Sequence, residues 1–257
     1  MSTPEVVVHR SPRVLASAVA ARLLTRLVDL QSGGGVPSWV LTGGSIADRV
    51  HAEVGASGAR DAVDWQRVQL WWGDERFVRA EDDQRNELQA RGNLLDLLEL
   101  APSRVHPMPA DDGSWDVETA AAAYAAELAT AAAPEDHGSS PTFDILMLGV
   151  GPEGHVASLF PEHPGVHDPR TAFAVRGSPK PPPTRISLGF NSLNRAREVW
   201  FVVAGDDKAA AVQLALSGSG RLQVPAAGVT GSSRTLWLLD AAAASKLPPG
   251  LHRISSP

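Results

Sequence analysis

Short apolar runs alternate along this chain with segments of helical length, and four of the runs are followed by glycine and then by polar or charged residues. The four predicted strands are Ser38–Leu41, Val68–Trp72, Phe143–Leu148 and Glu198–Ala204. Continuous apolar strands between helices are typical of parallel sheets, because the connecting helices cover both faces. The pattern therefore predicts a three-layer α/β/α Rossmann-like fold with a mostly parallel sheet.

Further elements continue this alternation. We expect a strand at Glu5–His9 and a helix from Pro12 to about Leu30, with Ser11 as N-cap. The prolines of Ser178–Pro183 predict an extended polyproline II segment. No repeat or linker-like tract divides the chain, so we expect one domain over residues 1–257. The other predicted elements are the helices Ile46–Val54, Asn86–Leu98, Val117–Ala133 and Asp206–Leu216 and the strands Thr171–Val175, Arg185–Leu188 and Thr235–Leu239, the last followed by a short helix.

Composition excludes several classes of protein. A net charge of −6 argues against a nucleic-acid partner, which needs a basic face. The chain has no cysteine, which rules out disulfides, thiolate metal sites and a cysteine nucleophile. No leader-like segment is recognisable and no apolar run approaches the roughly 20 residues that span a bilayer, so we expect a cytoplasmic protein with no membrane partner.

The polar segments after the four strands should meet, because all strands of a parallel sheet end at the same edge. The first of these segments is Gly43-Gly44-Ser45, between a strand and a helix. Bare N–H groups, a hydroxyl and a helix N-terminus make a binding site for an anion such as phosphate. The alternative is a tight turn in which Ser45 only caps the helix. The chain contains no P-loop motif.

Two basic residues are further candidates for anion binding. Lys208, one of three lysines, is predicted in the first turn of a helix, where the helix dipole opposes a cation unless an anion is bound. Alternatively, the neighbouring Asp206 and Asp207 neutralise it, or its side chain points to water. Arg185 follows the proline-rich segment, which could fix its approach to an anion or could be only a surface loop or a PxxP ligand.

Three ionisable residues follow the strand Val68–Trp72, and we expect them in a loop. Arg76 could bind a phosphate or stabilise an oxyanion, and Asp74 could act as a base or orient another group. The alternative is a cluster of surface ion pairs that includes Glu75.

The segment Leu146–Pro161 carries the candidate base, His155, at the predicted start of a helical turn. Glu153, two residues earlier, could orient the imidazole or favour the N-terminus of that turn. Three glycines before it match the dinucleotide-binding fingerprint, but Pro161 leaves no room for the long helix that this motif requires. A zinc site from His155, His163 and His167 is disfavoured because prolines interrupt the helical spacing.

The segments LTGGS, WWGDERFV, GVGPEGHVASLFP, Arg185-x-Ser-Leu and VWFVVAGDDKAAAV, in this order, resemble the 6-phosphogluconolactonase family, and SPKPPPTR resembles its actinobacterial members. The resemblance implies the fold shared with glucosamine-6-phosphate deaminase and ribose-5-phosphate isomerase. It implies hydrolysis of 6-phospho-D-glucono-1,5-lactone to 6-phosphogluconate, the second step of the oxidative pentose phosphate pathway. We also expect that the protein needs no metal or organic cofactor and that it is a monomer or weak homodimer.

Carried over onto this chain, the resemblance makes His155 the general base, with Glu153, Asp74 and Arg76 as the other catalytic residues, and makes Gly43, Gly44, Ser45, Arg185 and Lys208 the phosphate ligands. Two segments depart from the family pattern. Ile46-Ala47 stand where threonine and proline usually follow the glycine-rich turn, and Glu153 stands where aspartate is common.

The expected mechanism is hydrolysis without a covalent intermediate. His155 takes a proton from the attacking water, and Arg76 or loop N–H groups stabilise the oxyanion. The nearest rival is a sugar-phosphate isomerase or deaminase of the same fold, with Asp74 as the base. A sugar-phosphate-sensing domain of a transcriptional regulator is disfavoured, because only about ten residues precede the first helix and the net charge is acidic.

Overall fold

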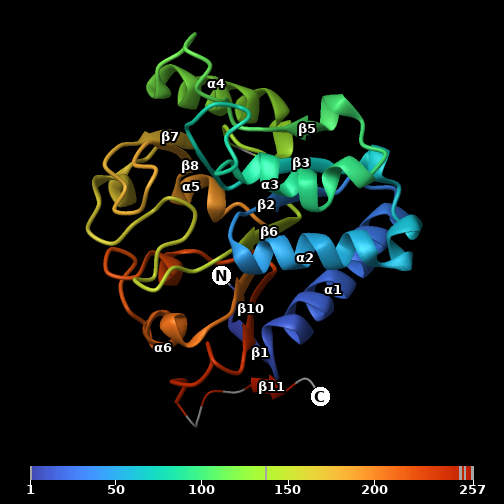
Figure 1. Cartoon of the computed structure of the whole chain (residues 1–257), viewed down its shortest axis with the longest axis vertical. Coiled ribbons are helices and arrows are strands. Elements are labelled where there is room, and N and C mark those ends of the chain that lie inside the picture. The colour runs from blue at the N-terminus through green and yellow to red at the C-terminus, as the bar shows by residue number, and fades with distance from the viewer. Residues whose placement is uncertain (1, 137, 249–250, 252, 256–257) are drawn as a thin grey trace.

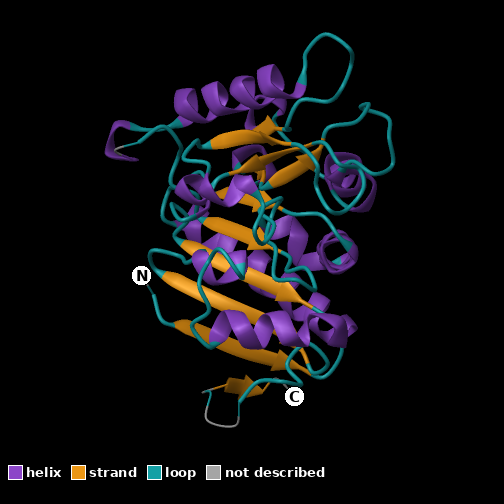
Figure 2. Ribbon diagram, turned by 90° about the vertical axis from the view of Figure 1, so that its left-hand side faces the viewer, coloured by secondary structure: helices purple, strands orange, loops and turns teal. Residues whose placement is uncertain are grey.

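A computed structural model describes residues 2–136, 138–248, 251 and 253–255. In this part of the chain, eight strands form a sheet in which every neighbouring pair is parallel, which confirms the predicted fold class (Figures 1 and 2). In spatial order the strands are β11 (Arg253–Ser255), β1 (Pro4–His9), β10 (Arg234–Asp240), β9 (Glu198–Val203), β6 (Ile145–Leu148), β2 (Ser38–Leu41), β3 (Gln69–Trp72) and β5 (Val105–His106).

Helices cover both faces of this sheet. In Figure 1, α1 and α2 lie on one side of the sheet, and α5 and α6 lie on the other. The helices are α1 (Pro12–Ser32), α2 (Ser45–Ala56), α3 (Asn86–Asn93), α4 (Val117–Ala131), α5 (Phe190–Leu193) and α6 (Ala209–Leu216). Ser11 caps α1 as predicted, since its hydroxyl accepts from the N–H of Val14 at 3.3 Å and Pro12 follows it.

A second, three-stranded antiparallel sheet was not foreseen. It consists of β4 (Asp74–Arg76), β8 (Arg185–Leu188) and β7 (Ala172–Val175), with β8 in the middle. The prediction of a loop at Asp74–Arg76 is therefore wrong: these polar residues pair with β8 directly after β3 ends. Helix α4 packs on β7 and β8 (Figure 2). The second sheet thus carries Asp74, Arg76 and Arg185 on adjacent strands.

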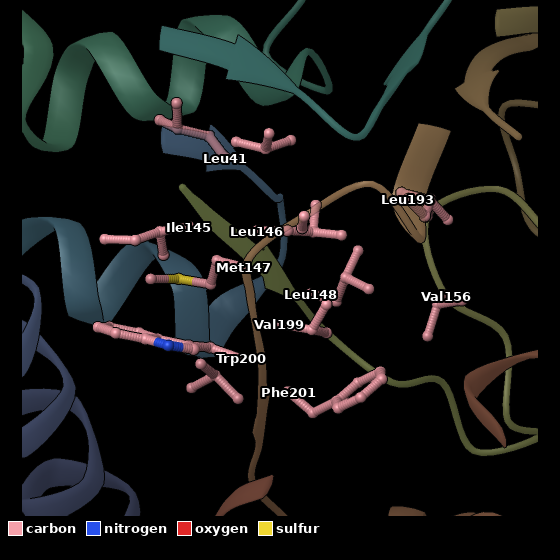
Figure 3. Close-up of a cluster of buried hydrophobic side chains, with 14 of the residues drawn as sticks. Leu41, Ile145, Leu146, Met147, Leu148, Val156, Leu193, Val199, Trp200 and Phe201 are labelled. Carbon is pink, nitrogen blue, oxygen red and sulfur yellow. The ribbon is translucent and has the colours of Figure 1, made fainter. Parts of the chain in front are cut away.

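The centre of the core lies between β6 and β9, where every side chain of both strands is buried. Figure 3 shows Leu146 and Leu148 of β6 close to Val199 and Phe201 of β9. Burial of such side chains contributes roughly 1.5–3 kcal/mol each, so these central strands form a firm base for the loops that follow them.

Several local predictions differ from the structure. The helix expected at Asn86–Leu98 ends at Asn93 and is followed by a 3₁₀ turn, and a 3₁₀ turn at Asp206–Lys208 precedes α6. No helical turn begins at His155; Val156 and Leu159 form an isolated bridge there instead. Turns, not a helix, follow β10. The short elements β5, β11 and α5 were not predicted.

The proline-rich loop, Ser178–Pro183, is not an extended polyproline II segment. It bends back on itself, and the N–H of Ser178 donates to the carbonyl of Pro183 at 3.0 Å. Among the residues that the structure describes, no helix combines the length and the apolar character that a membrane crossing requires.

Candidate active site

The segments after β2, β3, β6 and β9 surround one cavity of about 390 Å³. Eight of the nine candidate residues line it, and only Glu153 does not. The eight are Gly43, Gly44, Ser45, Asp74, Arg76, His155, Arg185 and Lys208. The cavity has room for a small sugar phosphate, and it lies where parallel sheets bind their ligands, beyond the carboxyl ends of the strands.

Backbone geometry shapes the glycine-rich turn between β2 and α2. Gly44 is the N-cap of α2, and its φ of 104° is costly for any other residue. Ser45 is the first helical residue and does not cap the helix with its side chain, which answers the alternative of a purely capping role. A Cβ at Gly43 would overlap the amide oxygen of Asn86. The turn therefore presents the N-terminus of a twelve-residue helix to the cavity.

Glu75 joins β4 to the start of α3. Its carboxylate accepts from the N–H groups of Arg76 and Asn86 at 2.8 and 2.7 Å and of Glu87 at 2.8 Å. Burial raises the pKa of Glu75 to about 7, although Arg85, at 3.9 Å, and the three N–H groups oppose this rise. The side chain is 1% exposed, so it belongs to the frame of the site and not to a surface ion-pair cluster.

Asn86 is a cavity residue that the sequence analysis missed. Its amide donates to the carbonyl of Asp74 at 2.9 Å, and its oxygen accepts from Nη1 of Arg76. The same Nη1 donates to the carbonyl of Gln84 at 2.9 Å. Among the described residues, Arg76 has no carboxylate within ion-pair distance, and its positive charge acts from farther away on the carboxyl of Asp48, whose pKa it lowers against the rise caused by burial.

Arg76 and Arg185 face each other across the second sheet as a directly paired register position. Two like charges opposite one another on adjacent strands destabilise a sheet. Burial lowers the pKa of Arg185, which Asp74 counteracts and Arg76 reinforces. A bound anion would relieve this repulsion, so the register favours a negatively charged ligand.

Asp74 is 6% exposed and fixed by a second residue that the sequence analysis missed, Ser158. The hydroxyl of Ser158 donates to Oδ2 of Asp74 at 2.6 Å, and Nη1 of Arg185 lies 3.9 Å from the same oxygen. The Nε and Nη2 atoms of Arg185 donate to carbonyls of the proline-rich loop. Arg185 thus lines the cavity with most of its donors already used by the protein.

His155 lies against Gly151, where a Cβ would overlap the imidazole. Its Nδ1 is 2.9 Å from Oε1 of Glu153, an arrangement in which Nδ1–H donates to the carboxylate and Nε2 is left as the basic atom. Burial raises the pKa of Glu153, but the hydrogen bond from His155, a backbone N–H and the charges of His155 and Lys180 outweigh it and bring it to about 2. Glu153 therefore lies behind His155 as an ionised partner.

The structure also shows the partners of Lys208 and of His163, the first a candidate phosphate ligand and the second a candidate zinc ligand. Nζ of Lys208 lies 2.8 and 2.7 Å from the two carboxylate oxygens of Asp207, so the neutralised alternative describes this conformation, although both residues line the cavity. His163 is not placed as a metal ligand, because its Nδ1 accepts from the N–H of Gly165 and its Nε2 donates to the carbonyl of Arg176. The described residues contain no group of three or more side chains suited to a metal.

Lys180 is the third missed residue of the site. It lines the cavity, and its Nζ lies 3.2 Å from Oε2 of Glu153. Its rarity could have drawn attention to it, because the chain has three lysines against twenty arginines. Asn86 and Ser158 carry no such signal, since their roles arise only from contacts between distant segments.

Comparisons with known proteins identify the family and the fold of this chain. The profile of one family, described as glucosamine-6-phosphate isomerases/6-phosphogluconolactonase, matches residues 10–237. A curated 6-phosphogluconolactonase of Streptomyces coelicolor is 58% identical over 253 residues, which are 97% of either chain. The crystal structure of 6-phosphogluconolactonase from Leishmania guyanensis has a TM-score of 0.79 and 25% identity, covering 96% of this chain and 100% of that one. A monomeric glucosamine-6-phosphate deaminase, with a TM-score of 0.74, 18% identity and coverage of 93% and 98%, shares the fold alone.

Proposed function

Because this chain belongs to the family of glucosamine-6-phosphate isomerases and 6-phosphogluconolactonases, we propose that it hydrolyses 6-phospho-D-glucono-1,5-lactone to 6-phospho-D-gluconate, the second step of the oxidative pentose phosphate pathway. The observation that carries the proposal is the imidazole of His155, hydrogen-bonded to the ionised Glu153, on a cavity that Arg76 also lines. The identity of 58% to a 6-phosphogluconolactonase favours the lactonase over the deaminase.

The substrate phosphate would bind at the turn of Gly43, Gly44 and Ser45. There the N-terminal N–H groups of α2 and the hydroxyl of Ser45 meet an anion. Lys208 would exchange part of its contact with Asp207 for the phosphate, and Arg185 would add its buried charge. Binding the phosphate orients a small polar substrate that offers little apolar surface.

The hydrolysis step would begin at Nε2 of His155, which takes a proton from water as the oxygen of that water attacks the lactone carbonyl carbon. Arg76 would stabilise the oxyanion that forms, because its guanidinium lines the cavity and no carboxylate of the described residues lies within ion-pair distance of it. The imidazolium would then return its proton to the ring oxygen as the C–O bond breaks. Asp74, fixed by Ser158, would hold Arg185 and accept a hydrogen bond from a substrate hydroxyl.

A rate measurement with freshly prepared lactone tests the proposal, after subtraction of spontaneous hydrolysis. With the wild-type protein, the lactone should be hydrolysed to acid faster than in buffer alone. His155→Ala should lower kcat by about 10²–10⁴-fold. Glucosamine 6-phosphate serves as the control substrate in the same preparation. Release of ammonia without lactone hydrolysis would overturn the lactonase proposal. Near wild-type turnover by His155→Ala would overturn the role of His155 as the base.

The remaining parts of the proposal concern the cellular compartment, the oligomeric state and the partners of the protein. We place the activity in the cytoplasm, since a phosphorylated substrate does not leave the compartment in which it is made. Residues 1–257 would act as one unit, as a monomer or weak homodimer, without a nucleic-acid partner. Size-exclusion chromatography with light scattering measures the oligomeric state.

A further inference from the structure

Lys180 connects the proline-rich loop to the candidate base. Its Nζ lies 3.2 Å from Oε2 of Glu153, while Oε1 of the same carboxylate bonds to Nδ1 of His155. Glu153 is thus shared between an imidazole and an ammonium group. The side chain of Glu153 therefore lies between those of Lys180 and His155, and the contact with Lys180 joins two segments that are distant in sequence.

Two sets of hydrogen bonds fix the backbone of Lys180. The hydroxyl of Ser178 donates to the carbonyl of Lys180 at 2.9 Å and accepts from its N–H at 3.3 Å. From the other side, the buried guanidinium of Arg185 donates to the carbonyls of Lys180 at 3.0 Å, Pro181 at 3.3 Å and Pro182 at 3.1 Å. The position of Lys180 is therefore determined by the loop and not only by its long side chain.

Deepening the proposed function, on which it rests, we infer that Lys180 is a positioning residue for the base: its ammonium group holds the outer oxygen of Glu153 and keeps His155 in the neutral form that accepts a proton. A carboxylate beside an imidazole stabilises the imidazolium, and a cation on the far oxygen of that carboxylate reduces this stabilisation. A general base must be neutral before the reaction.

The Lys180–Glu153 contact contributes little to folding stability. The two side chains are 40% and 34% exposed, and ion pairs at such positions typically contribute under about 1 kcal/mol. Its effect belongs to the charge balance of the site. Charged groups from other elements also line the cavity, and a change at Lys180 leaves them in place: Asp74 and Arg76 of β4, Arg185 of β8, and Asp207 and Lys208 before α6.

The test replaces Lys180 with methionine, which keeps the length of the side chain and removes its charge. As the pH falls, kcat/KM of this variant for the lactone should begin to decrease at a higher pH than in the wild type. The acid limb of the pH profile should shift up by about half a unit to one unit. The NMR titration midpoint of the His155 imidazole should move by the same amount in the absence of substrate. Lys180→Arg, which restores a cation, should return both values towards those of the wild type.

Lys246→Met is the matched control, because it removes the same charge from a turn outside the cavity and should change neither measurement. An unchanged His155 midpoint in Lys180→Met would overturn the inference, and so would a change confined to KM, which would indicate direct substrate binding. Because the NMR titration needs no substrate, a shifted midpoint in a protein that does not hydrolyse the lactone would leave the inference standing and refute the proposed function alone.

Discussion

Glu75 and Glu153 are both held next to the same cavity, but they meet different partners. Glu75 is buried and accepts from three backbone N–H groups, whereas Glu153 is a third exposed and contacts the side chains of His155 and Lys180. Burial dominates for Glu75 and raises its pKa to about 7, while hydrogen bonds and charge hold the pKa of Glu153 at about 2. The difference indicates that the first carboxyl fixes the backbone and the second sets the charge around the base.

The largest expected effect is on stability, and it distinguishes Glu75 from Glu153. Glu75→Ala should lower the free energy of unfolding by about 3 kcal/mol or more, because it leaves the backbone N–H groups of Arg76, Asn86 and Glu87 without their acceptor inside the protein. Urea unfolding measures the loss. Glu75→Gln, which keeps one acceptor oxygen, should lose less. An alanine variant within 1 kcal/mol of the wild type would contradict the structural role.

Gly151→Ala should act on the other region through the imidazole. The added Cβ would overlap His155 and approach Glu153, so the ring must leave its hydrogen bond. We expect a loss of about 100-fold in kcat, which corresponds to about 2.7 kcal/mol of activation free energy. Gly92→Ala, in α3 with open space at its Cβ, is the control and should retain activity. Full activity of Gly151→Ala would show that the position of His155 is not critical.

Glu153→Gln should reduce activity without much change in stability. The amide oxygen can still accept from Nδ1 of His155, but the negative charge that stabilises the imidazolium is lost. We expect kcat to fall by about 10- to 100-fold and the free energy of unfolding to change by less than about 1 kcal/mol. Steady-state rates and urea unfolding of one preparation measure both. A stability loss equal to that of Glu75→Ala would remove the contrast between the two carboxyls.

The smallest expected changes, taken per pH unit, are opposite pH dependences of stability. Because the pKa of Glu75 is raised from 4.5 to about 7, its contribution is fully present below pH 4.5 and is lost as the pH rises through 7, by at most about 1.4 kcal/mol per unit. Because the pKa of Glu153 is lowered from 4.5 to about 2, its contribution is present above pH 4.5 and is lost as the pH falls towards 2. The free energy of unfolding should vary less with pH above 4.5 in Glu75→Gln and below 4.5 in Glu153→Gln than in the wild type. Curves parallel to the wild type in both variants would contradict both assignments.

The parallel sheet was predictable because its signal is local. Apolar runs such as Ile145–Leu148 are buried on both faces, and the glycines after the strands mark where each chain segment turns at the sheet edge. The same local signal predicts that Gly43, Asp74 and His155 lie at one edge of the sheet. The second sheet could not be predicted in this way, because β4 is three polar residues that resemble a loop until β8 pairs with it.

The sequence by itself determined the fold class, the edge at which the ligand cavity forms, and the histidine that faces it, since strand direction and hydrophobic burial are encoded within each segment. Only the tertiary structure decided which charges meet. It placed Arg76 opposite Arg185, Asn86 against Gly43, and Lys180 on the far oxygen of Glu153. These contacts join segments that are distant in the chain, and their electrostatics depend on burial and distances of a few ångström, which no local pattern specifies.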